Sequence, residues 1–80
     1  MKETKQLLKD LKNLISKETG VSREEIALNS HFEEDLNIDT FEFANLMISV
    51  EEVFNVEINP EDIEKIKTVQ NLLHFLEDNL

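Results

Sequence analysis

Thr40 is the residue whose type and position are best suited to chemistry. Asp39 before it is a favourable helix N-cap, and Glu42 follows that aspartate by three residues, in the order of a capping box. A helix is therefore predicted to begin at Thr40. The free N–H groups and the dipole of its first turn favour an anion, such as a phosphodiester, at the threonine hydroxyl. A threonine at a first helical position also needs no function, so the spacing alone leaves both interpretations open.

The other side chains offer little for catalysis. The chain has no Cys and a single Gly, which excludes thiolate chemistry, disulfides and a glycine-rich phosphate loop. The two histidines, His31 and His74, are far apart in the sequence, and we interpret both as surface or boundary residues. Nothing places either of them beside a Ser or Thr nucleophile. We therefore expect no catalytic residue and no enzyme activity.

One run of oxygen-bearing side chains is similar to the start of a calcium-binding EF-hand loop. Asp35, Asn37 and Asp39 occupy alternate positions, as the first ligands of such a loop do. The sixth position of the loop needs Gly but holds Thr40, and the twelfth needs a bidentate Glu but holds Leu46. The pattern fails at both positions, and we expect no metal site.

The composition favours one folded domain. Leu, Ile, Val and Phe number 28 of the 80 residues, well above the ~20% below which an acidic chain stays disordered. A second core would be too small to be stable, so residues 1–80 are predicted to form a single domain. The single Gly and single Pro argue against an all-β fold, which needs many special turns.

The acidity of the chain is concentrated in its middle. The net charge is −10, but residues 1–17 carry +3 and residues 18–64 carry −13. Such a field repels nucleic acid and anionic lipid, and it attracts basic protein surfaces. Charge alone does not distinguish a docking surface from simple solubility. We expect no nucleic-acid partner.

No membrane insertion is expected. The longest uninterrupted apolar run is Leu46-Met47-Ile48, far shorter than the ~20 residues that a membrane-spanning helix requires. The first residues are charged and amphipathic and do not resemble a targeting segment. We therefore expect a soluble protein of the cytoplasm or of an organelle matrix, and we adopt the cytoplasm as the expected location.

Apolar residues at helical spacing predict an all-α fold, a small four-helix bundle of three main helices and one short helix. The first helix ends at Gly20, the second begins after Asp39, the short one opens at Asn59-Pro60, and the last follows Thr68. Between the first two, a capping-box pattern at Ser22–Glu25 predicts one helical turn, with Ile26 and Leu28 facing inward. Residues 29–38 are predicted to form a loop anchored by Phe32, Leu36 and Ile38.

The second helix is predicted to have two different faces. Its buried stripe consists of Phe43, Leu46, Met47, Val50, Val53 and Phe54. Its polar, acidic stripe consists of Glu42, Asn45, Ser49 and Glu52.

Residues 34–42, Glu-Asp-Leu-Asn-Ile-Asp-Thr-Phe-Glu, resemble the attachment segment of acyl carrier proteins, commonly written E-D-L-G-A-D-S-L-D. The similarity continues through residues 50–62 and 66–72 and covers roughly residues 5–78 with no insertion. The resemblance implies a four-helix bundle whose second helix is an acidic recognition surface. It also implies a serine at the start of that helix that carries 4′-phosphopantetheine, on whose thiol acyl chains are held as thioesters.

Carried over to this chain, the resemblance assigns cofactor binding to Thr40, at the serine position, and to Asp39 before it. The implied partners are a phosphopantetheinyl transferase and acyl-transferring or acyl-modifying enzymes with basic docking patches. The carrier itself is expected to be a monomer. The implied partner-binding acids are Asp35, Glu42, Glu51, Glu52 and Glu57. Residues expected to line an acyl-chain cavity, although each also suits ordinary core, are Phe43, Leu46, Met47, Val50 and Ile66.

The chain departs from the family pattern at its centre. Thr40 stands for the serine, Phe41 for the leucine after it, and Asn37-Ile38 for Gly-Ala. A secondary hydroxyl with stiffer rotamers is expected to react more slowly, Phe41 adds bulk beside it, and Phe43 reduces the cavity. Asn37 can adopt the left-handed backbone that Gly would supply.

Three interpretations follow from this departure. The first is a carrier that shuttles thioester-bound acyl groups in fatty acid, lipid or polyketide biosynthesis, with 4′-phosphopantetheine on Thr40. The second is a carrier-like protein that is never loaded and serves as a docking or regulatory module. The third is an engineered threonine that keeps a carrier unmodified. We adopt the first as the expected function and keep the second as its alternative.

Overall fold

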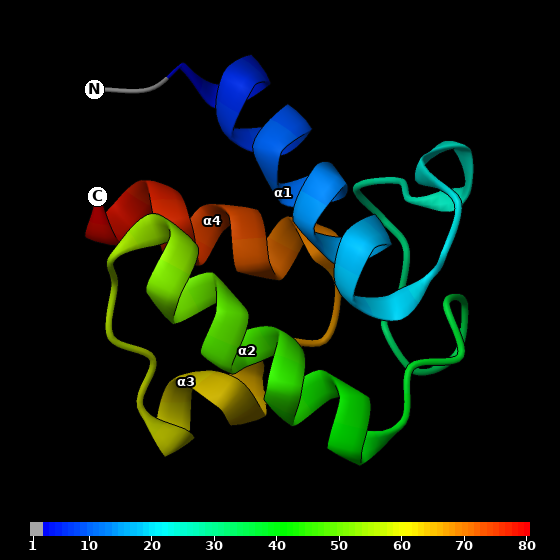
Figure 1. The fold of residues 1–80 in the computed structure, drawn as a ribbon. Coiled ribbons are helices and arrows are strands. Elements are labelled where there is room, and N and C mark those ends of the chain that lie inside the picture. Colours follow the sequence, from blue (N-terminus) through cyan, green and yellow to red (C-terminus); the bar gives the residue numbers. More distant parts are fainter. Residues whose placement is uncertain (1–2) are drawn as a thin grey trace.

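The computed structural model describes residues 3–80, which form four α-helices joined by one long loop and shorter turns (Figure 1). The elements are α1 (Thr4–Thr19), the 3-10 turn η1 (Arg23–Glu25), α2 (Thr40–Phe54), α3 (Pro60–Lys65) and α4 (Val69–Asn79). Within the described residues β pairing is limited to one isolated bridge between His31 and Thr68. The predicted all-α fold, with three main helices and one short one, is confirmed.

The main helix boundaries lie where the local signals predict them. Gly20 ends α1 with φ 79°, in the left-handed region, and its N–H donates to the Ser16 carbonyl. Pro60 is the first residue of α3, where its missing N–H costs nothing. The Thr68 hydroxyl accepts from the Asn71 N–H at 3.1 Å at the start of α4. Short-range side-chain chemistry therefore determines where these helices begin and end.

The prediction for residues 22–28 is partly wrong. The turn η1 forms, but Ser22 makes no side-chain cap; its hydroxyl donates to the Glu24 carboxylate, which lowers the pKa of that carboxyl. Leu28 is 39% exposed rather than buried. Because the chain leaves the 3-10 geometry at Ile26, helical spacing no longer governs Leu28. Its carbonyl accepts from the Gln70 N–H at 2.9 Å, so backbone pairing positions this segment.

The predicted stripes of α2 also need correction. Val53, expected in the buried stripe, is 60% exposed, because it lies about 100° around the helix from the buried Phe54. Ser49, expected on the solvent side, is half-buried, and its hydroxyl donates to the Glu18 carboxylate of α1 at 2.8 Å. The side of α2 that carries Ser49 therefore faces α1 rather than water.

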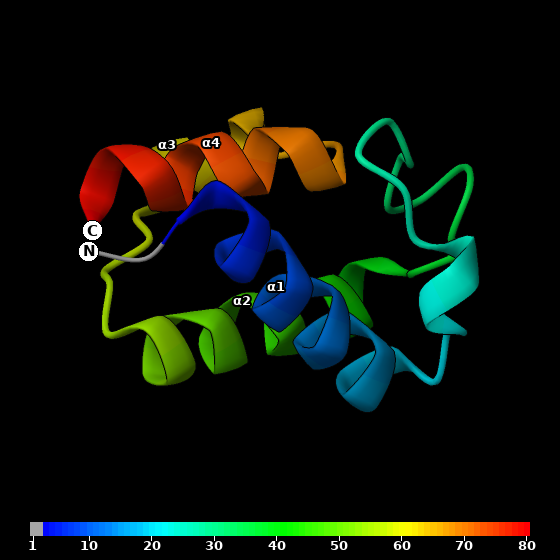
Figure 2. The ribbon, with the colours of Figure 1, turned by 90° about the horizontal axis from the view of Figure 1, so that it is seen from above.

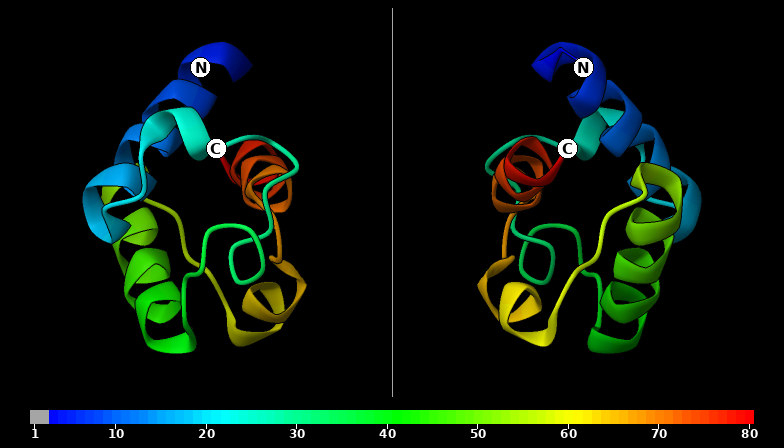
Figure 3. Two further views of the ribbon diagram at one scale, coloured as in Figure 1. Left: turned by 90° about the vertical axis from the view of Figure 1, so that its right-hand side faces the viewer. Right: turned by 90° about the vertical axis from the view of Figure 1, so that its left-hand side faces the viewer.

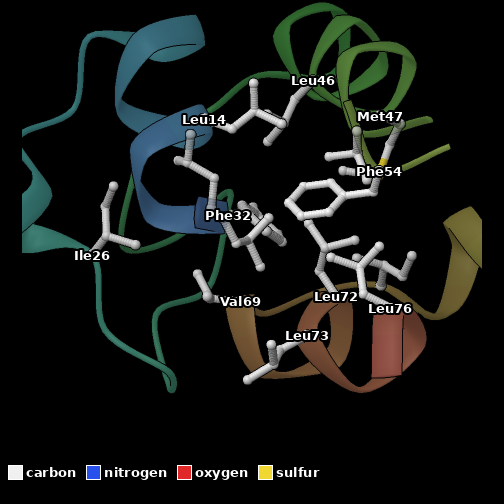
Figure 4. Packing of buried hydrophobic residues seen from close by; sticks show 14 of the residues in the cluster. Leu14, Ile26, Phe32, Leu46, Met47, Phe54, Val69, Leu72, Leu73 and Leu76 are labelled. Atoms are coloured by element: carbon white, nitrogen blue, oxygen red, sulfur yellow. The ribbon is translucent and has the colours of Figure 1, made fainter. Parts of the chain in front are cut away.

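The core forms where α1 packs against both α2 and α4. Figure 2 shows α1 lying across the space between these two helices, and Figure 3 shows α1 and α3 at opposite ends of the molecule with α2 and α4 on either side. Side chains of the three long helices, among them Leu14, Met47 and Leu72, point into one interior (Figure 4). Within residues 3–80, the end of the molecule opposite α1 carries the short helix α3 rather than a fourth long helix.

Candidate functional site

Thr40 is the first residue of α2 and is exposed. The capping box on which the prediction rested is present: one Asp39 carboxylate oxygen accepts from the Glu42 N–H at 2.8 Å, and the Glu42 carboxylate accepts from the Asp39 N–H at 3.3 Å. Within residues 3–80 the Thr40 hydroxyl makes no hydrogen bond. The helix start is thus held rigidly by its neighbours while the hydroxyl remains available.

The backbone that leads to Thr40 turns sharply at Asn37. This residue has φ 56°, in the left-handed region that glycine occupies most easily and asparagine tolerates. The next residue, Ile38, is buried, and its N–H donates to the Phe32 carbonyl at 2.9 Å. The expectation that Asn37 adopts a left-handed backbone is confirmed.

The loop before α2 is fastened to the junction between α3 and α4. The Phe32 N–H donates to the Lys67 carbonyl at 3.0 Å, and the Val69 N–H donates to the Ser30 carbonyl at 3.1 Å. Ser30 is buried, and its hydroxyl accepts from the Ala27 N–H at 3.0 Å. Two segments far apart in the sequence therefore hold each other in place beside Thr40.

His31 has a structural role in this loop. Its ring is half-buried, and Nδ1 accepts from the N–H groups of Glu33 and Glu34, both at 3.2 Å. The His31 N–H donates to the Asp35 carboxylate at 2.6 Å. The interpretation of His31 as a boundary residue agrees with this placement, and His74 lies exposed on α4.

A groove of about 410 Å³ opens beside Thr40, between the loop, the start of α2 and α3. The residues that line it are His31, Phe32, Glu33, Glu34, Ile38, Thr40, Phe43, Ile63, Glu64, Ile66 and Lys67. A smaller hollow of about 250 Å³ lies on the loop side and is lined by Glu33, Asn37, Ile38, Asp39 and Thr40. Thr40 borders both, so a group attached to its hydroxyl would have apolar surface within reach.

The inner wall of the groove is an aromatic pair. The rings of Phe32 and Phe43 are tilted by 57° with centroids 5.3 Å apart, a geometry that contributes about 0.5–1.5 kcal/mol beyond its buried area. Phe32 is almost wholly buried, whereas Phe43 is half-buried and also borders the groove. The pair therefore forms part of the apolar lining where the groove meets the core, together with the buried Ile38 and Ile66.

Only part of the predicted cavity lies along this groove. Phe43 and Ile66 line it, whereas Leu46, Met47 and Val50 are at most 2% exposed and belong to the packed core. Sequence reasoning did not assign Ile38, Ile63 or Lys67 to the cavity, and these do line the groove. Nothing in their local spacing indicates it, since Ile38 comes from the loop, Ile63 from α3 and Lys67 from the segment just after α3.

The predicted docking acids differ in their exposure and in whether their carboxylates accept hydrogen bonds within the protein. Glu52 and Glu57 are exposed, and Glu42 is exposed but engaged in the capping box. Glu51 is half-buried, and its carboxylate accepts from the Ile58 N–H at 2.8 Å, which holds the turn after α2. Glu51 therefore has a structural contact of its own.

The outer face of α2 is not purely acidic. Phe41, Asn45, Ile48 and Glu52 recur at helical spacing and are all exposed, with Phe41 at 75% and Ile48 at 54%. We call these four residues the α2 outer face. Exposed large apolar residues beside carboxylates are typical of protein-binding surfaces.

These features define a class of protein. A rigidly held helix start presents a free hydroxyl, an apolar groove lies beside it, and an apolar and acidic helix face extends away from it. Among residues 3–80, no three His, Cys, Asp or Glu side chains converge to hold a metal ion. The arrangement suits a small helical carrier domain.

Comparison with known proteins identifies the family. Residues 9–76 match the family model described as "Phosphopantetheine attachment site". The acyl carrier protein of Coprothermobacter proteolyticus is 36% identical over 78 residues, covering 98% of this chain and 95% of the relative. The acyl carrier protein of Cyanidium caldarium is 33% identical over 75 residues, covering 94% and 87%. The chain belongs to the acyl carrier protein family, a family of non-catalytic carriers that serve acyl-handling enzymes.

The family's prosthetic group is 4′-phosphopantetheine, and the residues present fit it. The Thr40 hydroxyl is exposed, and the N–H groups of Thr40 and Phe41 precede the intrahelical hydrogen bonds, so they can face a phosphodiester. The neighbouring groove offers apolar surface to the rest of the group. None of the helices in the described part of the chain has the length and apolar character needed to cross a membrane.

Proposed function

We propose that this protein carries acyl groups on a 4′-phosphopantetheine arm attached to Thr40. The proposal rests most directly on one observation: the free hydroxyl at the start of α2, beside the apolar groove, lies within the segment that matches the attachment-site family. The group supplies a flexible arm whose terminal thiol holds acyl chains as thioesters. One domain, residues 1–80, would perform this role.

In the loading step the chain contributes a nucleophile at a fixed position. The Thr40 oxygen forms a bond to the phosphorus of coenzyme A that bears the pantetheine, its proton passes to the transferase, and adenosine 3′,5′-bisphosphate leaves. Asp39 and Glu42 hold the helix start, so the hydroxyl does not need to be ordered during the encounter. The first-turn N–H groups favour the negative charge of the phosphodiester that remains.

Partner recognition is assigned to the α2 outer face and the acids near it. The transferase and the acyl-handling enzymes would approach with basic patches, because residues 18–64 carry a net charge of −13. Phe41 and Ile48 supply apolar contact area at the centre of such an interface, and Glu52 lies at the same face. Asp35, Glu42 and Glu57 are exposed and extend the acidic field.

The proposal extends to a cytoplasmic, monomeric carrier in fatty acid, related lipid or polyketide synthesis. The sequence motivates these finer assignments through its charge distribution and its resemblance to acyl carrier proteins. Light scattering during size-exclusion chromatography tests the monomeric state, and a dimer at micromolar concentration would contradict it.

Intact-mass measurement tests the proposal. The protein is incubated with coenzyme A and a broad-specificity phosphopantetheinyl transferase, and we expect a gain equal to one phosphopantetheine group. Thr40→Ser should load faster, because a primary hydroxyl without the neighbouring methyl is less hindered. Thr40→Val keeps the β-branched shape without the hydroxyl and should gain nothing.

The outcome also separates the two functions that the sequence leaves open. An unchanged mass for the natural chain, together with loading of Thr40→Ser, would contradict the carrier proposal and favour an unloaded docking module. Loading of Thr40→Val would place the group on another residue and contradict the assignment of Thr40.

A further inference from the structure

We propose that His31 is a pH-sensitive cap on the loop that leads to Thr40: its neutral ring holds a turn of the loop, and its protonated ring releases that turn. This inference goes beyond the proposed function, because it concerns the conformation of the unloaded protein. It holds whether or not Thr40 carries a group.

The His31 ring caps a turn of the loop in the way that a serine or asparagine caps a helix start. Its Nδ1 atom accepts from the N–H groups of Glu33 and Glu34, which follow it by two and three residues, both at 3.2 Å. A ring nitrogen that accepts hydrogen bonds carries no proton. Because an imidazolium has a proton on both nitrogens, protonation of the ring removes both contacts at once.

The backbone of His31 is held by contacts that do not involve the ring. Its carbonyl accepts from the N–H groups of Asp35 and Leu36 at 2.9 and 3.1 Å, and its N–H donates to the Asp35 carboxylate at 2.6 Å. The next residue, Phe32, donates to the Lys67 carbonyl at 3.0 Å. The ring can therefore leave while the chain around it stays anchored, so the release is confined to the turn and its neighbours.

The charged side chains around the ring offer new partners to its protonated form. The ring is half-buried and shares the groove beside Thr40 with most of them. Carboxylates attract an imidazolium, and an ammonium group repels it. The charged groups are Glu33, Glu34 and Asp35 of the loop, Glu64 of α3, and Lys67 just after α3. Four carboxylates against one ammonium group favour a ring that turns away from the two N–H groups once it is protonated.

Release of the turn changes one wall of the groove beside Thr40. The loop contributes Phe32, Glu33, Glu34 and Ile38 to that wall. Histidine ordinarily changes its charge between about pH 5 and 8, whereas carboxylates ordinarily titrate below about pH 5. The turn is therefore expected to be ordered at about pH 7.5 and loosened at about pH 5.5, in an interval where the acids stay ionised.

Nuclear magnetic resonance of the unloaded protein tests the inference at constant salt between about pH 7.5 and 5.5. In the natural chain the amide signals of Glu33 and Glu34 should move together with the ring signals of His31. Their protection from hydrogen exchange should fall by about tenfold, because two hydrogen bonds are lost. His31→Asn is the matched variant, since its side-chain oxygen accepts from the same N–H groups and does not titrate. Its amide signals and their protection should stay constant.

Urea unfolding gives a second readout. His31→Ala lacks the cap at every pH, so it should be less stable than the natural chain at about pH 7.5, and the two should converge at about pH 5.5. The difference between the natural chain and His31→Asn cancels the contribution of the acids that both contain. His74→Asn removes the other histidine, which is exposed on α4, and should leave the pH dependence of the natural chain unchanged.

Three results would overturn the inference. The first is an equal pH dependence of the natural chain and His31→Asn, and the second is equal stability of the natural chain and His31→Ala at about pH 7.5. The third is a gain in stability of the natural chain over His31→Asn on acidification, which would show that attraction to the carboxylates outweighs the cap. Failure of enzymatic loading on Thr40 would instead contradict the proposed function and would leave these measurements unchanged.

Discussion

The two ends of α2 differ in how completely they are packed. At the first turn Thr40 and Phe41 are exposed, and Phe43 is shared between the aromatic pair and the groove. From Leu46 to Phe54 the inward side chains are at most 7% exposed and belong to one core cluster with side chains of α1 and α4. The inward side of the C-terminal part of α2 is therefore fully packed into the core, and we call this part the closed end. The first turn of α2 is only partly packed, and we call it the open end.

This difference shows how a very small protein can be both stable and functional. The closed end supplies apolar burial, which is the main stabilising contribution in a chain of this length. The open end is held instead by capping hydrogen bonds and by the pairing of the loop with the α3–α4 junction. Surface chemistry can therefore vary at the open end with little effect on the core.

The largest expected contrast is between truncations at the two ends. Leu46→Ala should lower the free energy of unfolding by about 3–5 kcal/mol, because it leaves a cavity at a residue that is 0% exposed. Phe41→Ala, which removes a larger side chain from the open end, should change it by less than about 0.5 kcal/mol. Urea unfolding of both variants measures the difference. Equal losses would show that the open end is part of the core.

A smaller contrast is expected between two neighbouring acids. Glu51→Ala should cost about 1–3 kcal/mol, because the half-buried N–H of Ile58 loses its partner. Glu52→Ala, one position later and exposed, should be within about 0.5 kcal/mol of the natural chain. Thermal unfolding of the pair decides whether the Glu51 contact stabilises the turn; indistinguishable midpoints would exclude it.

The smallest expected effect concerns docking rather than folding. Glu52→Lys should lower the association rate with a transferase several-fold at low salt, because it reverses a charge on the α2 outer face. The difference should shrink as salt is raised and screening increases. Glu25→Lys makes the same change in net charge on η1 and should have a weaker effect. Equal slowing by both variants would indicate net charge rather than a docking face.

The helices were predictable because their signals are local. Asp39 with Glu42, Asn59 before Pro60, and Thr68 each lie within a few residues of the helix start that they determine. The predicted side-chain positions were wrong where contacts between residues far apart in the sequence determine the structure. Leu28 is positioned by pairing with Gln70, and Ser49 by its hydrogen bond to Glu18.

The position of Thr40 was predictable for the same reason, but the groove beside it was not. Its walls combine the loop, the first turn of α2 and the region of α3, brought together by hydrogen bonds such as that from Phe32 to Lys67. Helical periodicity predicts the same environment for Phe43 as for Leu46, Met47 and Val50, because all four lie on one side of α2. Only the tertiary arrangement separates the groove residue from the three core residues.

The central claim is that the open end of α2 is the point of attachment, and site-resolved mass spectrometry tests it most directly. After treatment with coenzyme A and a phosphopantetheinyl transferase, fragmentation of the protein should place one phosphopantetheine group on Thr40. The absence of any group on the natural chain, in a preparation that loads Thr40→Ser, would contradict the claim. A group found on any other hydroxyl would contradict it as well.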